Sequence, residues 1–136
     1  MKLSKKIINT LAENAITAKS KSYSPYSKFK VGASVITSDG EIFNGCNIEN
    51  ESYSLTICAE RSALFNSFIN GKKNIFAIAI TSDDKNFLTP CGACLQVISE
   101  LAPNAKLILV NNIGKIKLTT LKKLFPNPPD LKFLAS

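Results

Sequence analysis

Two nearly continuous apolar runs constrain the fold of this chain most. They cover residues 74–81 (NIFAIAIT) and 105–112 (AKLILVNN). A strand with one face in water alternates apolar and polar residues, whereas an unbroken apolar run is typical of a strand covered on both faces. The sequence therefore predicts a sheet with helices packed against both sides.

The remaining strands are expected before and after these runs. Residues 29–36 and 41–48 alternate on either side of Ser38-Asp39-Gly40, which predicts a hairpin. A further short strand and a final helical turn are expected just before Pro126.

Three segments are expected to form helices. They are the amphipathic residues 4–19, residues 57–70, which Gly71 ends, and residues 91–102. Together with the strands they predict one α/β domain over residues 1–136, a three-layer α/β/α sandwich around a mixed five-stranded sheet.

Composition limits the classes of function. The chain has 136 residues, of which 45% are hydrophobic, and this is enough to bury a core. The basic N-terminal segment lacks the unbroken apolar run of a signal peptide, and no run approaches the roughly 18 apolar residues of a membrane span. We therefore expect a cytoplasmic protein with no membrane partner, whose cysteines stay reduced.

The net charge invites a nucleic-acid interpretation, which the distribution of charge does not favour. The formal net charge is +7, but 16 of the 17 basic residues are scattered lysines and the sole arginine is Arg61. Bidentate recognition of base edges prefers arginine. We expect a solvated surface and no nucleic-acid partner.

Cysteines carry the sharpest local signal. The sequence PCGAC (90–94) places Cys91 and Cys94 on the first turn of an expected helix, near unpaired N–H groups that lower the pKa of a thiol. Such a pair can bind a metal ion or carry out thioredoxin-like redox chemistry. Alone, the motif leaves both interpretations open.

A second cysteine at a helix start favours the metal ion. Cys58, in TICAERSAL (56–64), lies 33 positions before Cys91 and also opens an expected helix. Because the chain has no histidine, a structural site closed by four protein ligands would need Cys46 as its fourth ligand. Strand alternation turns Cys46 to the face opposite that of Asn47, where we expect its side chain to fill the core. Three protein ligands instead leave the fourth position to water, as in catalytic zinc sites.

Glu60 follows Cys58 by two positions and can share its site only if the helix points at that site end-on. Beside a zinc ion, which makes water acidic enough to yield hydroxide near neutral pH, Glu60 could pass a proton to a substrate. The alternative is an ordinary acidic residue in a first helical turn. Because Cys58, Cys91 and Cys94 are expected at the same site, we favour proton transfer as the role of Glu60.

These motifs resemble those of the cytidine deaminase family. Cys-Ala-Glu-Arg (58–61) followed by Pro-Cys-Gly-Ala-Cys is similar to the zinc deaminase signature in its three-cysteine form. Residues 24–33, 45–64 and 89–101 are similar to family blocks in the same order, and the resemblance spans about residues 4–126. It implies one zinc ion per chain, bound by Cys58, Cys91 and Cys94, with Glu60 as the proton shuttle.

The resemblance also implies a substrate site. Phe29 matches the aromatic residue that packs against the pyrimidine ring, and Asn47 and Glu49 match the pair that holds the ribose hydroxyls. Arg61 matches a residue that hydrogen-bonds a ligand thiolate. Tyr53 matches a residue near the substrate and the subunit interface in a family usually built as homotetramers, with a dimer as the alternative here.

The implied activity is zinc-dependent hydrolytic deamination of cytidine and deoxycytidine to uridine and deoxyuridine, with release of ammonia, in pyrimidine salvage. The sequence departs from the family pattern at Leu95, where many relatives have arginine, and at Pro129, where relatives place a phenylalanine over the substrate that Phe133 could replace. These departures keep open a deaminase of a modified nucleoside or nucleoside antibiotic. A thiol oxidoreductase and a zinc-stabilised binding module are the alternatives from other classes.

Overall fold

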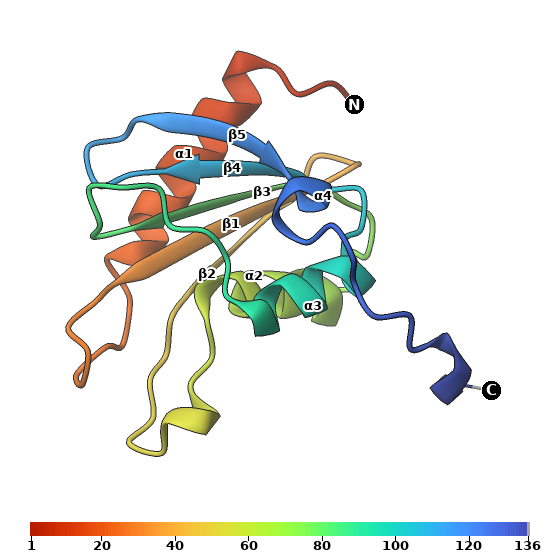
Figure 1. The fold of residues 1–136 in the computed structure, drawn as a ribbon. Coiled ribbons are helices and arrows are strands. Elements are labelled where there is room, and N and C mark those ends of the chain that lie inside the picture. The colour runs from red at the N-terminus through yellow and green to blue at the C-terminus, as the bar shows by residue number, and fades with distance from the viewer. Residues whose placement is uncertain (136) are drawn as a thin grey trace.

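The computed structural model describes residues 1–135 and contains a five-stranded mixed sheet (Figure 1). The strands are β1 (Val31–Thr37), β2 (Ile42–Cys46), β3 (Ile75–Ser82), β4 (Lys106–Val110) and β5 (Ile116–Thr120). Their order across the sheet is β2-β1-β3-β4-β5. Only β3 and β4 pair in parallel in this sheet, and the other neighbours are antiparallel. The predicted mixed sheet is thus confirmed.

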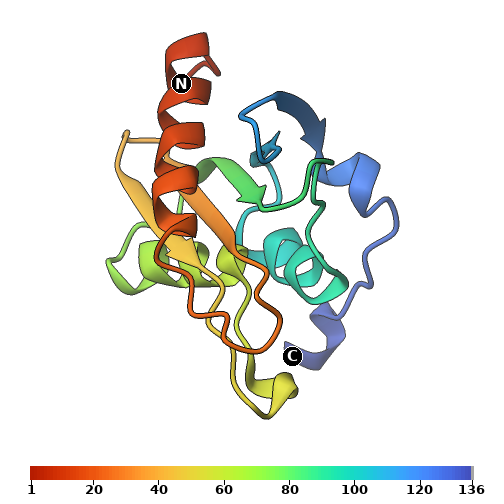
Figure 2. The same ribbon diagram turned by 90° about the vertical axis from the view of Figure 1, so that its left-hand side faces the viewer.

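Helices cover both faces of the sheet, as the apolar runs require (Figures 1 and 2). The helices are α1 (Lys5–Lys19) on one face and α2 (Ala59–Ile69) and α3 (Gly92–Leu101) on the other, with α4 (Leu121–Leu124) following β5 and the 3₁₀ turns Tyr53–Leu55 and Lys132–Ala135. The three-layer α/β/α sandwich is confirmed. No helix within residues 1–135 is long and apolar enough to cross a membrane.

Alternate residues of the central strands pack into two separate core layers, one on each face of the sheet. Ala77 and Ile108 face α1, whereas Ile78, Leu107 and Leu109 face α2 and α3. All five side chains are essentially inaccessible to solvent. The two apolar runs are therefore central strands covered on both faces.

Two strand glycines let helices approach the sheet at backbone distance. A Cβ atom at Gly32 would lie 2.1 Å from the carbonyl oxygen of Ala15 in α1. A Cβ atom at Gly45 would lie 2.3 Å from the backbone nitrogen of Ala63 in α2. The contact at Gly45 fixes the position of α2 on the sheet and hence the position of its N-terminal end.

An ion cluster closes the hairpin between β1 and β2. The turn contains Gly40, whose φ of 91° lies in the left-handed region. Lys72, beyond the end of α2, places Nζ 2.8 Å from Asp39 Oδ2 and 3.2 Å from Glu41 Oε2. The cluster thus joins the hairpin to the segment that follows α2.

Candidate active site

The N-terminal ends of α2 and α3 bring three sulfur atoms together. Cys58 and Cys91 are the N-cap residues of these helices, each with extended backbone, which is why both helices begin one residue later. The Sγ atoms of Cys58, Cys91 and Cys94 all lie within 4.8 Å of one another, and those of Cys58 and Cys91 are 3.7 Å apart. Tetrahedral zinc with Zn–S bonds of about 2.3 Å places its sulfurs about 3.8 Å apart. The geometry fits a zinc ion.

Charge around the sulfurs also calls for a cation. The neighbouring Cys94 thiol and a hydrogen bond that Nη2 of Arg61 donates to Cys58 at 3.5 Å lower the pKa of Cys58 to about 5. The pKa of Cys94 is raised because its thiol lies beside Cys58 and is buried near Glu60. The hydrogen bond from Arg61 to Cys58 in turn raises the pKa of Arg61. One guanidinium does not balance three thiolates and a carboxylate, and a divalent cation would offset most of the remaining negative charge.

Cys46 does not belong to the sulfur cluster. Its Sγ lies 3.4 Å from the carbonyl oxygen of Lys21, and it borders a separate cavity of about 250 Å³ that Ala18 and Ser62 also line. Within residues 1–135, the side chains grouped closely enough to share a metal ion are Cys58, Cys91 and Cys94. The structure therefore offers three thiol ligands and leaves the fourth position to a non-protein group.

Glu60 lies beside the sulfurs at the wall of a small cavity. The cavity measures about 180 Å³ and is lined by Val31, Asn47, Thr56, Cys58, Ala59, Glu60, Leu88, Thr89 and Cys91. Glu60 is only 3% exposed, and burial raises its pKa, with a smaller contribution from the charge of Cys58. Helix α2 does point its N-terminal end at the site, as the spacing of Cys58 and Glu60 requires.

Asn47 follows β2 and braces the segment that leads into β1. Its Nδ2 donates to the carbonyl oxygen of Phe29 at 2.8 Å, and its Oδ1 accepts from the backbone N–H of Val31 at 2.9 Å. The hydroxyl of Ser22 also donates to Oδ1. The oxygen is then saturated, while one Nδ2 hydrogen has no partner in residues 1–135.

Glu49 braces the same segment further along. Its Oε1 accepts from the backbone N–H groups of Tyr26 and Ser27 at 3.0 and 3.1 Å, and its Oε2 accepts from the Ser27 hydroxyl. The hydrogen bond from that hydroxyl is the first cause of the lowered pKa of Glu49. The carboxylate stays ionised and keeps acceptor capacity on Oε2.

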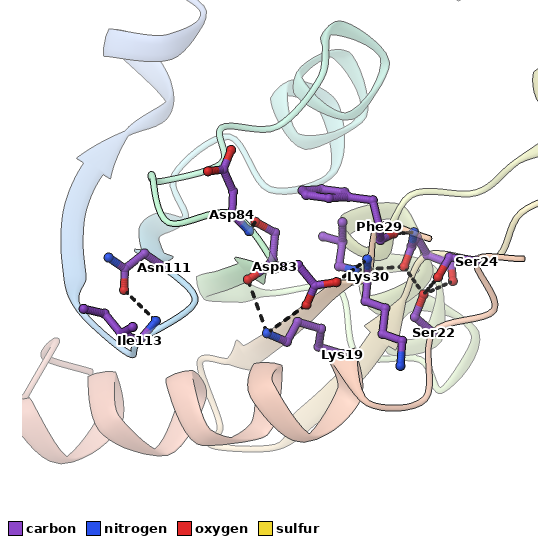
Figure 3. A network of polar contacts seen from close by, with 12 residues as sticks. Lys19, Ser22, Ser24, Phe29, Lys30, Asp83, Asp84, Asn111 and Ile113 are labelled. Atoms are coloured by element: carbon purple, nitrogen blue, oxygen red, sulfur yellow. Dashed lines mark hydrogen bonds and ion pairs between the residues drawn. The ribbon is translucent and has the colours of Figure 1, made fainter. Parts of the chain in front are cut away.

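A second brace approaches from β3 (Figure 3). Oδ2 of Asp83 accepts from the backbone N–H of Lys30 at 3.0 Å, and Nζ of Lys19 lies 3.4 Å from Oδ1 of Asp83. Lys19 also donates to the carbonyl oxygen of Ser82 at 3.3 Å. The backbone around Phe29 is thus held from both sides.

The structure separates the predicted substrate residues into two groups. Asn47 lines the cavity, whereas the half-buried Phe29 packs against the core beside it and is not among its lining residues. Tyr53 is 65% exposed and stacks edge-on against Tyr26, with ring centroids 6.2 Å apart. Tyr53 therefore lies where the loop between β2 and α2 meets the loop between α1 and β1.

The sequence interpretation assigned no role to Ser22, Ser27 or Asp83. Their hydrogen bonds to Asn47, Glu49 and Lys30 span 22 or more positions along the chain, which no local periodicity reveals. The available signal was the block SPYSKFKVGA, residues 24–33, of which only Phe29 received a role.

An α/β/α sandwich that gathers three thiols beside a protonatable carboxyl group at the wall of one cavity is suited to a zinc-dependent hydrolytic deaminase. Residues 5–110 match the family model described as the zinc-binding region of cytidine and deoxycytidylate deaminases. The chain belongs to this family of zinc-dependent deaminases.

Individual relatives agree with the family. The chain is 46% identical over 117 residues to a cytidine deaminase of Halalkalibacterium halodurans, covering 85% of this chain and 89% of the relative. It is 40% identical over 132 residues to a cytidine deaminase of Sporosarcina psychrophila, covering 94% and 97%. The crystal structure of cytidine deaminase from Burkholderia pseudomallei superposes with a TM-score of 0.86 at 43% identity, covering 89% of this chain and 98% of that one.

Proposed function

We propose that the protein hydrolyses free cytidine and deoxycytidine to uridine and deoxyuridine, releasing ammonia. The observation that carries this proposal is the position of Glu60, buried against the cavity that Cys58 and Cys91 also line. A carboxyl group there can exchange protons with water and with a base seated in the cavity.

The residues divide the chemistry between them. Cys58, Cys91 and Cys94 hold one zinc ion, which supplies the Lewis acidity that makes water nucleophilic near neutral pH. Glu60 takes a proton from the attacking water, gives a proton to the ring nitrogen next to the amino-bearing carbon, and then protonates the departing amine. A C–O bond forms at that carbon, its C–N bond breaks, and water and cytidine become uridine and ammonia.

Two electrostatic features suit Glu60 to this work. Its burial raises its pKa, so that the carboxyl group takes up a proton more readily than an exposed carboxyl group does. Arg61 donates to Cys58 and thereby balances part of the negative charge beside Glu60.

The nucleoside site combines an aromatic ring with a donor and an acceptor. We assign Phe29 to the pyrimidine ring. The free Nδ2 hydrogen of Asn47 and the free acceptor capacity of Glu49 suit a sugar hydroxyl, which can accept from the amide and donate to the carboxylate. Tyr53 borders the same site from its loop.

A small cavity favours a free nucleoside over a polynucleotide. The space beside Glu60 is about 180 Å³, and the single arginine of the chain is committed to Cys58. A polynucleotide groove requires a basic path with aromatic stacking platforms. We therefore propose a free nucleoside as the substrate, without a nucleic-acid partner. We place this activity in pyrimidine salvage in the cytoplasm, without a membrane partner.

Exposed apolar side chains near the site support assembly into a homotetramer. They are Tyr23, Tyr26, Ile48, Tyr53 and Leu55, each at least 44% exposed. Apolar side chains gathered on two neighbouring loops are typical of an interface. Light scattering of the native protein separates four chains from the alternative of two.

The test is the ultraviolet absorbance of cytidine incubated with the zinc-loaded protein and with Glu60→Ala. The wild type should convert cytidine to uridine, whereas Glu60→Ala should retain zinc and lose at least about 100-fold in turnover. Turnover of the variant within tenfold of the wild type would refute the role of Glu60. An inactive wild type with bound zinc would instead direct the search to modified nucleosides, beginning with Leu95 and Pro129.

A further inference from the structure

One hydroxyl group links the two halves of the proposed nucleoside site. The Oγ of Ser27 donates to Oε2 of Glu49 and accepts from the backbone N–H of Phe29 at 3.0 Å. A serine hydroxyl has one hydrogen to donate and two lone pairs to accept with, so it can make both bonds together. The Oγ atom of Ser27 therefore contacts both the carboxylate and the backbone N–H of the residue that carries the aromatic ring.

The residue between Ser27 and Phe29 shows that this segment needs external support. Lys28 has a φ of 60°, which places a non-glycine residue in the left-handed region. Its backbone N–H donates to the carbonyl oxygen of Ser24 at 3.0 Å. Such a conformation persists where surrounding contacts hold it, and Glu49 and Ser27 provide those contacts on the side facing the site.

The hydrogen bonds of Glu49 show what the Ser27 hydroxyl adds. The backbone N–H groups of Tyr26 and Ser27 both donate to Oε1, and they hold that oxygen but not Oε2. The hydroxyl is the partner of Oε2 within residues 1–135, and so it sets where the remaining acceptor position of the carboxylate points.

We propose that Ser27 is a positioning residue for nucleoside recognition, whose hydroxyl aims Oε2 of Glu49 at a sugar hydroxyl and fixes that carboxylate relative to Phe29. This inference rests on the proposed function, because it assigns Glu49 to the sugar. Ser27 itself does not touch the reacting atoms, so its loss should weaken binding and leave the chemical step intact.

The experiment compares Ser27→Ala and Ser27→Thr with the wild-type holoenzyme. Ser27→Ala should raise KM for cytidine about tenfold, the effect of losing one hydrogen bond to a charged group, while kcat stays within about twofold. Ser27→Thr keeps the hydroxyl and should restore KM. Ser52→Ala is the matched control, because Ser52 lies in the loop after Glu49 and its hydroxyl makes no hydrogen bond in residues 1–135.

A sugar without hydroxyls on its 2′ and 3′ carbons isolates the role of Glu49. The inhibition constant of 2′,3′-dideoxycytidine should be the same for wild type and Ser27→Ala, since that ligand offers no such hydroxyl to Glu49. In a Glu49→Gln background, Ser27→Ala should change KM for cytidine by less than about twofold, because the two side chains act together.

The outcomes separate three cases. A wild type that does not turn over cytidine refutes the proposed function and this inference with it. An active wild type with an unchanged KM in Ser27→Ala refutes the inference alone. Equal losses for cytidine and the dideoxy ligand, without rescue by threonine, would assign Ser27 to loop structure and also refute the inference.

Discussion

Cys46 and Cys94 are a natural pair for testing the metal site at the scale of single residues. Both are at least half-buried thiols, but Cys94 belongs to the sulfur cluster and Cys46 contacts the Lys21 carbonyl. Cys94→Ser should lose its zinc because the site loses one of three ligands, whereas Cys46→Ser should retain it. Metal analysis after gel filtration measures both. Zinc loss from Cys46→Ser would restore the closed four-cysteine site of a binding module.

The chemistry-bearing residues were more predictable than the residues that position them. Cys58 and Cys91 were recognisable because a loop, a thiol and an amphipathic segment follow one another in each case, and the structure makes both of them N-caps. Ser27 and Asp83 were not, because their partners become neighbours only when β1 aligns with β2 and β3. A serine in a polar loop carries no signal of its own.

At the scale of elements, the approach of α2 to β2 depends on the missing side chain of Gly45. Gly45→Ala should destabilise the fold by about 1–3 kcal/mol, because its Cβ would lie 2.3 Å from the Ala63 nitrogen and 2.8 Å from the Ala59 carbonyl oxygen. Gly92→Ala is the control, since a Cβ there meets no atom within 4 Å. Urea unfolding of the zinc-loaded proteins compares them, and equal stabilities would contradict the close packing.

The hairpin cluster should make stability depend on pH. Hydrogen bonding to Lys72 lowers the pKa of Asp39 from 3.8 to about 2. Because the folded pKa is depressed, the stabilisation is complete above pH 3.8 and disappears as the pH falls through about 2. Lys72→Met should therefore be less stable than the wild type at neutral pH, and the two stabilities should converge near pH 2. An NMR titration of the Asp39 carboxyl checks the assignment, and an ordinary pKa in the wild type would refute it.

Element types followed from hydrophobic patterns, whereas element ends did not. The predicted strand over 41–48 ends at Cys46, since Ile48 forms only isolated bridges with Tyr23 and Ile57 in the described chain. Those bridges turn Asn47 and Glu49 toward the segment before β1. The 3₁₀ turn Tyr53–Leu55 had no sequence signal, because it is a single turn without buried residues.

At the scale of the whole molecule, a bound metal ion would join two helices that are far apart in sequence. Cys58 and Cys91 are 33 positions apart and cap different helices. Removing zinc with a chelator should lower Tm by at least about 5 °C, because a tightly bound ion stabilises only the folded state. The far-ultraviolet circular dichroism spectrum should persist, since the two core layers lie within the sheet and its helices. A Tm that does not respond to chelation would contradict zinc binding at this cluster.

The edge-on pair of Tyr26 and Tyr53 gives the molecule a built-in optical reporter. The chain has three tyrosines and no tryptophan, and Tyr23, Tyr26 and Tyr53 all lie on the two loops that hold Asn47 and Glu49. Tyrosine emission therefore originates entirely at these loops, because the sheet and the α-helices contain no tyrosine. Emission can follow ligand entry or subunit association at those loops in real time, without any attached dye.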